Sequence, residues 1–124
     1  SVGPSHEAEY LKITWDYIYN LGGNLDLNNM NDEFYGALRA WRARGMIYKC
    51  VWDYRFDLFI KKVKCPTLLM CSPDDVLYLG HKNTAEAMPH AKALDIKGSN
   101  FEPYFDPEGI SRGIAEFFKE NKLI

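Results

Sequence analysis

The sequence lacks most of the features that assign a protein to a class at once. Its 124 residues contain only three cysteines, Cys50, Cys65 and Cys71, and no C-x-x-C spacing. We therefore expect no zinc site, and the odd set of thiols favours a reducing, cytoplasmic compartment. No apolar run reaches the ~18–20 residues that span a bilayer, so we expect no membrane partner.

An excess of charge of one sign is also missing. The chain has 15 Lys and Arg against 17 Asp and Glu, a formal net charge of −2, and a pI near 5.9. This balance argues against nucleic acid as the main partner. The sequence contains neither G-x-G-x-x-G nor a phosphate-binding loop, so we expect no nucleotide-type cofactor.

Aromatic residues, in contrast, make up 15% of the chain and are concentrated between residues 10 and 59. Such residues form either the packed core of a helical unit, which is the default, or the lining of an apolar pocket. For the second reading we select Trp15, Trp41, Trp52 and Tyr54 as candidates to bind a small, largely apolar substrate.

The first half of the chain predicts helices. Apolar residues recur at helical spacing over residues 5–21, and Ser5 is the expected N-cap. A second helix is expected to begin after Asn31 and to end at Gly45. The stretch 46–60 mixes apolar and charged residues, and we interpret it as helical or irregular.

The second half has a different pattern. The apolar residues 68–71 predict a buried strand over residues 67–71, residues 78–88 a helix, and residues 92–96 a second strand. Asp106 is the expected N-cap of a last helix that runs over residues 107–121. A strand–helix–strand unit of this length implies parallel strands joined by a crossover.

Two parallel strands do not make a stable sheet by themselves. Parallel sheets need three or more strands and cover on both faces, and an isolated pair leaves both edges open. We therefore expect further strands from a second chain, from an N-terminal segment removed by cleavage, or from another copy of this chain in a homo-oligomer.

Polar side chains follow both predicted strands. The turn Ser72-Pro-Asp-Asp75 follows the first strand, and Gly98-Ser-Asn-Phe101 follows the second. Open α/β sheets bind their ligands at the carboxyl ends of such strands. The alternatives are that Asp74 and Asp75 cap the next helix and that Asn100 is a turn residue with left-handed backbone geometry.

These patterns resemble the C-terminal third of α/β-hydrolase-fold proteins. The stretches that carry the resemblance are Pro66-Thr-Leu-Leu-Met70, Ser72-Pro-Asp-Asp75 and Ile96-Lys-Gly-Ser-Asn-Phe101. They are similar to the family patterns P-T-L-L-x-x-G-x-x-D, which carries the catalytic acid, and G-x-x-H-F, which carries the catalytic histidine. The resemblance implies that residues 1–60 form the helical cap, that residues 61–124 form the C-terminal part of the core, and that Asp75 occupies the acid position.

The sequence also departs from the family. Ser72 stands in place of a glycine, and Asn100 stands in place of the catalytic histidine, although an amide cannot act as a general base near neutral pH. His81 and His90 are the other candidates for the role of the histidine, with a surface position as the default for both. The nucleophile elbow G-x-S-x-G is absent from these residues.

The combined reading is one part of an α/β-hydrolase-type enzyme whose nucleophile lies elsewhere. Because the histidine is missing, non-hydrolytic chemistry of the lyase or cyclase type is expected, with Asp75 and Asn100 as the catalytic candidates. The alternatives are a non-catalytic descendant of the fold that binds a ligand or a protein, and an independent small domain that self-associates.

Overall fold

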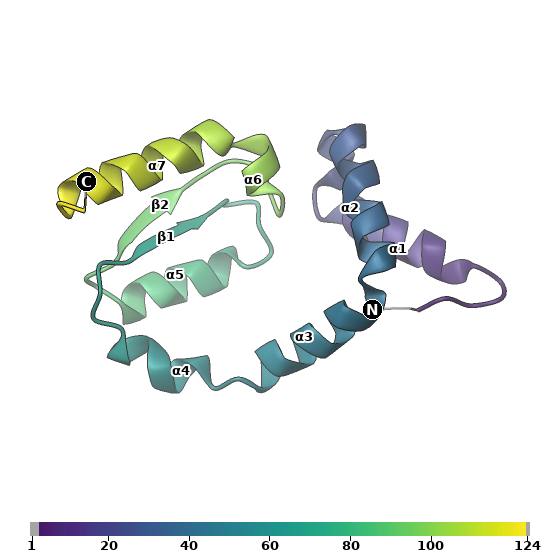
Figure 1. Cartoon of the computed structure of the whole chain (residues 1–124), viewed down its shortest axis with the longest axis horizontal. Helices are drawn as coiled ribbons and strands as arrows, with labels where there is room; N and C mark the ends of the chain where they lie inside the picture. Colours follow the sequence, from purple (N-terminus) through teal and green to yellow (C-terminus); the bar gives the residue numbers. More distant parts are fainter. Residues whose placement is uncertain (1–2, 124) are drawn as a thin grey trace. The chain divides into compact units, whose positions relative to one another are not determined.

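The computed structural model describes residues 3–123 and separates the chain into two compact units, which divide between Arg55 and Phe56. Figure 1 labels the elements of both units. The described chain is mostly helical and contains one two-stranded parallel sheet, so its class is mixed α/β. The boundary that the resemblance implies, at residue 60, falls within a 3-10 turn of the second unit.

The first unit is entirely helical in its described residues. Its elements are α1 (Glu9–Asn20), the 3-10 turn η1 (Gly23–Leu25), α2 (Leu27–Arg39) and α3 (Trp41–Asp53). Its core is formed by Ile18 of α1 together with Met30 and Ala37 of α2. Trp15 packs edge-on against Phe34, with ring centroids 5.3 Å apart, which ties α1 to α2.

The second helix begins earlier than the sequence predicts. Asn31 is the expected cap, but α2 begins at Leu27 because Asp26 is the N-cap. The Asp26 Oδ1 atom accepts the backbone N–H groups of Asn28 and Asn29 at 2.9 and 2.8 Å. A carboxylate that satisfies two unpaired N–H groups of the first turn fixes the helix start.

Two other predicted helix ends are also wrong. α1 begins at Glu9 and not after Ser5, since Ala8 occupies the N-cap position with a left-handed φ of 55°. Gly45 does not end a helix but lies inside α3, and the chain breaks at Ala40 instead. A glycine inside a helix costs about 1 kcal/mol relative to alanine, which the chain tolerates here.

The second unit confirms the predicted order of strand, helix, strand and helix. Its elements are α4 (Phe56–Phe59), η2 (Ile60–Lys62), β1 (Leu68–Cys71), α5 (Tyr78–Ala87), β2 (Lys92–Asp95), α6 (Glu102–Phe105) and α7 (Pro107–Glu120). β1 and β2 are parallel and in register from Leu68 opposite Lys92 to Cys71 opposite Asp95.

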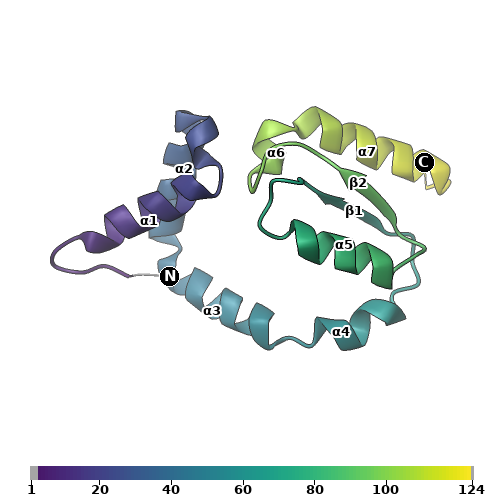
Figure 2. The ribbon, with the colours of Figure 1, turned by 180° about the vertical axis from the view of Figure 1, so that it is seen from behind.

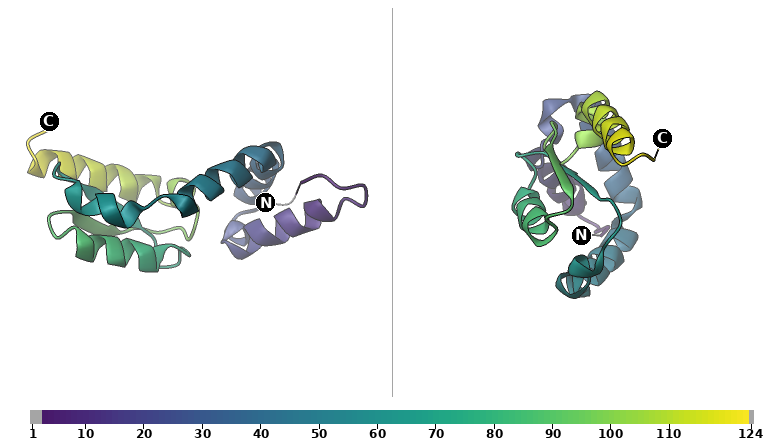
Figure 3. Two further views of the ribbon diagram at one scale, coloured as in Figure 1. Left: turned by 90° about the horizontal axis from the view of Figure 1, so that it is seen from below. Right: turned by 90° about the vertical axis from the view of Figure 1, so that its left-hand side faces the viewer.

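Helices cover both faces of this small sheet. A Cβ atom placed on Gly113 of α7 would lie 3.0 Å from Leu94 and 3.4 Å from Met70, so α7 packs on the face formed by these two side chains. α5 packs on β1 from the other face, as Figure 2 and the end-on view in Figure 3 show. The unit thus has three layers, in the order helix, sheet, helix.

Asp106 is the N-cap of α7, as predicted. Its Oδ1 atom accepts the backbone N–H of Gly109 at 3.0 Å, and its Oδ2 atom accepts the N–H of Lys97 at 3.0 Å. A Cβ atom on Gly109 would lie only 2.2 Å from the carboxylate, so this close approach requires glycine. Asp106 therefore joins the last helix to the loop that follows β2.

The strands are less buried than their composition predicts. Leu68, Leu69 and Met70 are only half-buried, and in β2 the side chains of Ala93 and Asp95 are exposed. Within the described residues each strand pairs with the other alone, so both outer edges are open. Among those residues we also find no helix with the length and apolar character needed to cross a membrane.

Candidate functional site

The loops that follow β1 and β2 are held together by a buried serine. Ser72 is only 1% exposed, and its Oγ atom accepts the backbone N–H groups of Asp74 and Ser99, each at 3.2 Å. The Ser99 hydroxyl in turn donates to the Asp74 carbonyl at 3.2 Å. The carboxyl ends of the two strands therefore form one connected polar edge, at the position where parallel sheets bind ligands.

This edge brings the two predicted catalytic residues close together. Asn100 accepts the backbone N–H of Val76 through its Oδ1 atom at 3.4 Å, and Val76 directly follows Asp75. Asp75 accepts the N–H of Leu77 through Oδ1 and donates its own N–H to the Ser72 carbonyl at 3.0 Å. Each of the two side chains thus accepts a hydrogen bond, through its Oδ1 atom, from a backbone N–H of the turn after β1.

Asn100 lies in the turn after β2, which the N–H of Phe101 closes on the Gly98 carbonyl at 3.0 Å, but its own backbone is not left-handed. The left-handed backbone positions are Gly98, with φ of 114°, and Ser99, with φ of 53°. Gly98 also has no room for a side chain, since a Cβ atom there would lie 2.7 Å from Phe105. The alternative reading of Asn100 as a turn residue is therefore confirmed, its left-handed geometry is wrong, and its amide oxygen also bridges the two loops.

A thiol and two carboxylates lie beside this pair. One ligand atom from each of Cys71, Asp75 and Glu102 lies within 4.8 Å of the other two. Burial raises the pKa of the Cys71 thiol, and the charges of Asp75 and Glu102 raise it further. The trio is thus compact enough to offer three ligand atoms to one cation, and without a cation its thiol stays protonated. Glu102 is also engaged, since its Oε1 atom accepts the N–H of Ser72 at 3.1 Å.

Tyr78 extends the polar edge, and the sequence reasoning missed it. Its hydroxyl donates to both carboxylate oxygens of Asp95 at 3.0 Å, and this hydrogen bond raises the pKa of Tyr78. Its ring stacks on His81 at 5.8 Å between centroids. His81 therefore lies near this edge, whereas His90 precedes β2 and lies at the opposite end of the sheet. The only available signal was the position of Tyr78 at the start of the helix after an acidic turn.

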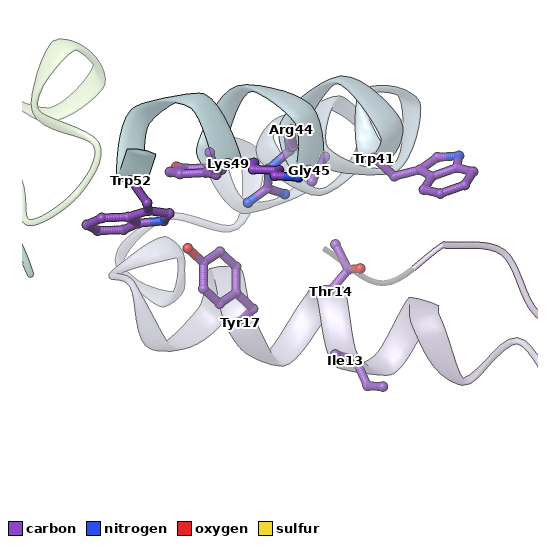
Figure 4. Close-up of a pocket in the computed structure, with 10 residues that line it drawn as sticks. Ile13, Thr14, Tyr17, Trp41, Arg44, Gly45, Lys49 and Trp52 are labelled. Carbon is purple, nitrogen blue, oxygen red and sulfur yellow. The ribbon is translucent and has the colours of Figure 1, made fainter. Parts of the chain in front are cut away.

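A separate pocket of about 530 Å³ lies within the helical unit. Figure 4 shows Tyr17 of α1 pointing toward α3, where Trp52, Arg44 and Lys49 lie above it. The Arg44 guanidinium lies 5.5 Å from the centre of the Tyr17 ring. Trp41 and Gly45 also line the pocket.

The predicted substrate-binding residues divide between this pocket and other places. Trp41 and Trp52 line the pocket. Trp15 is half-buried against Phe34 in the core, and Tyr54 follows α3 with 58% of its surface exposed, outside the residues that form the pocket. Contact of the four residues with a substrate stays a prediction.

The sequence reasoning missed Arg44 and Lys49 because it ended a helix at Gly45. With Gly45 inside α3, residues 41, 44, 45, 48, 49 and 52 share one helical face, at spacings of three and four. The signal was thus present in the sequence but was hidden by the wrong helix boundary.

No family model matches the chain, and no characterised protein or solved structure matches it either.

Proposed function

We propose that this chain is one part of an α/β-hydrolase-type enzyme that acts on a small, largely apolar metabolite by non-hydrolytic chemistry. In this proposal Asp75 and Asn100 contact the reacting group, and the helical unit acts as the cap. A second chain or an N-terminal segment completes the sheet and contributes the nucleophile. The reducing compartment of this enzyme is the cytoplasm.

The observation that carries the proposal is the meeting of Asp75 and Asn100 at one sheet edge. They are separated along the chain and come from loops after different strands, yet Asn100 bonds to the residue next to Asp75. An acid after one parallel strand and a polar partner after its neighbour is the arrangement that the family resemblance predicts. The buried Ser72 holds both loops in this position.

The chemistry of the pair favours a reaction without a general base at Asn100. The Asn100 amide cannot take up a proton near neutral pH, but its Nδ2 group can donate a hydrogen bond to a developing oxyanion. Asp75 keeps a second carboxylate oxygen, Oδ2, that can orient a substrate hydroxyl or accept its proton. A lyase or cyclase needs such a donor and acceptor but needs no triad histidine.

The apolar composition of β1 supports completion of the sheet by another segment. All four residues of β1 are apolar, whereas β2 exposes Ala93 and Asp95, as an edge strand does. Of the two open edges, that of β1 is therefore the one that an added strand would favour. Strand addition from another copy of the chain would cover the same edge, which keeps a homo-oligomer as one alternative.

A second candidate function is a non-catalytic binding protein of the same fold. It is favoured by the engagement of both candidate residues with the backbone. The Asp75 Oδ1 atom accepts the N–H of Leu77, and the Asn100 Oδ1 atom accepts the N–H of Val76. In this reading the two side chains hold the loops, and no reaction depends on them.

Metabolite profiles of the source cells test the proposal even while the substrate is unidentified. Cells that lack the chain are compared with cells that express the native form, Asp75→Asn, Asn100→Ala or the control Asp74→Asn. Asp74 suits this role because only its backbone atoms join the loop bonds. We expect one metabolite to accumulate in the deletion strain and in both site variants, but not in the control.

The alternative predicts a different profile. If both site variants restore the native metabolite levels while the protein stays folded, the enzyme proposal is wrong and the non-catalytic function is favoured. Native mass measurement of the isolated protein then tests completion of the sheet, because a lone 14.3 kDa species would contradict both the second segment and the homo-oligomer.

A further inference from the structure

The open pocket of the helical unit is lined by two positively charged residues among mostly apolar and aromatic side chains. We infer that it binds a planar aromatic molecule that bears a carboxylate, in a site formed entirely by α1, α2 and α3. This inference names the substrate class and rests on the proposed function only in treating that ligand as the substrate. The binding site itself does not depend on the chemistry at the strand ends.

The charge of the pocket is the first argument. Arg44 and Lys49 line it, and none of the described residues that line it is an aspartate or a glutamate. Arg44 is half-buried, and in the described part of the chain its contact is with the face of Tyr17 and not with a carboxylate. A guanidinium held over a ring keeps its N–H donors available, and these match a carboxylate in the bidentate geometry that arginine favours.

The shape of the pocket is the second argument. A volume of about 530 Å³ lies within the ~300–1,000 Å³ range of small-molecule sites. Trp41 and Trp52 lie on the same face of α3 about 16 Å apart along the helix axis, given a rise of 1.5 Å per residue. Flat indole and phenol rings favour flat apolar ligands, which stack on them.

Gly45 is the third argument. It lies between the two tryptophans along α3 and is one of the residues that line the pocket, so a larger residue at this position is expected to narrow the cavity. An interior helical glycine costs about 1 kcal/mol relative to alanine, so the position is unfavourable for the helix. The space that the missing side chain leaves provides a physical reason for the glycine.

Three probes that share one ring system test the ligand class. The full chain is titrated by calorimetry with 2-naphthoate, with the neutral 2-naphthamide and with the cationic 2-naphthylmethylamine. We expect 2-naphthoate to bind at least tenfold more tightly than the amide, and the cation to bind more weakly than both. Equal affinity for the acid and the amide, or no measurable binding of 2-naphthoate at millimolar concentration, would overturn the inference.

Paired variants locate the site. Arg44→Gln is expected to weaken 2-naphthoate at least tenfold and to leave 2-naphthamide unchanged. The control Arg39→Gln removes the same charge from an exposed position of α2 outside the pocket, and it should bind as the native chain does. Equal binding by Arg44→Gln and Arg39→Gln would contradict the assignment of the carboxylate to Arg44.

Filling the cavity supplies a test that does not depend on charge. Gly45→Leu should retain the helical circular dichroism signal and lose binding of both 2-naphthoate and 2-naphthamide. Its control is Gly36→Leu in α2, where a Cβ atom would meet nothing within 4 Å. Retained binding in Gly45→Leu would place the ligand elsewhere and overturn the inference.

The binding experiments and the metabolite profiles can give independent answers, so failure of the ligand proposal can be distinguished from failure of the proposed function. Binding of 2-naphthoate that depends on Arg44, together with unchanged metabolites in Asp75→Asn cells, would support the proposed ligand site and refute the proposed enzyme activity. Accumulation of the metabolite in Asp75→Asn cells, with no binding of any probe, would support the proposed enzyme activity and refute the aromatic carboxylate as the ligand of the pocket.

Discussion

Replacing Ser72 by alanine is expected to loosen the candidate site. The Ser72 hydroxyl accepts two backbone N–H groups, from Asp74 and Ser99, and it is 1% exposed. A buried donor that loses its acceptor costs about 1–3 kcal/mol. Both bonds are long at 3.2 Å and both are only partly buried, so we take the low end for each, about 2 kcal/mol in total.

Hydrogen exchange measures this loss where it occurs. A destabilisation of about 2 kcal/mol corresponds to a roughly 30-fold faster exchange of the Asp74 and Ser99 amides, if they exchange through opening of this unit. Urea unfolding gives an independent value. The tryptophans, Trp15, Trp41 and Trp52, all lie in the helical unit. Their fluorescence should therefore report an unchanged transition in the same sample.

The matched control is Ser111→Ala on α7. Ser111 is exposed, and its replacement should change stability by less than about 0.5 kcal/mol. If Ser72→Ala behaves as Ser111→Ala does, with equal exchange of the two amides, the hydroxyl does not join the loops. The proposal that the Ser72 hydroxyl holds the loops of Asp75 and Asn100 together would then be refuted.

Three further predictions concern other parts of the chain. The backbone N–H of Lys97, and to a lesser extent that of Gly109, lowers the pKa of the Asp106 carboxyl in the folded state. The stability that this carboxylate adds is therefore present above its unfolded-state pKa and is lost as the pH falls through its folded-state pKa. Acid titration of Asp106→Asn by circular dichroism should lack this loss. Burial raises the pKa of Cys71, so iodoacetamide at pH 8 should modify the two exposed cysteines first, as mass spectrometry of digests would show. Met30→Ala, at a side chain with no exposed surface, should cost about 2–5 kcal/mol and shift the tryptophan transition, while amide exchange in β1 stays unchanged.

The second unit could be predicted from the sequence because its signals are local and agree with one another. The apolar run ended by Ser72-Pro73 gives β1, and Asp106-Pro107 gives the start of α7 at the predicted residue. Parallel pairing follows from the length of the connection between the strands. The approach of Asp75 and Asn100 then follows from topology, since carboxyl ends of parallel neighbours lie at one edge.

The helical unit was predicted less well because several cap signals compete within a few residues. Asn31, Asn28 and Asp26 are all plausible caps, and only the hydrogen bonds of the Asp26 carboxylate select one of them. Gly45 carries the residue type of a helix end but lies inside α3. No residue of α3 is buried, so the helix continues through Gly45 because a single preference of about 1 kcal/mol is small beside those of its other residues.

The difference between the two strands indicates which edge of the sheet a further strand would favour, if the sheet is completed as proposed. In β2 the exposed residues alternate with Lys92 and Leu94, and Lys92 bonds to Glu120 at 2.7 and 2.8 Å, so this strand has the pattern and the charges of a natural edge. β1 has no alternation, and its leucines remain half-buried although helices lie on both faces. Full burial of a leucine side chain is worth about 1.5–3 kcal/mol. A further strand beside β1 would bury more of these leucines and would also form hydrogen bonds with the unpaired backbone N–H and C=O groups of β1. Any added strand, from another chain or from a second copy, should therefore pair with β1 and leave β2 at the edge.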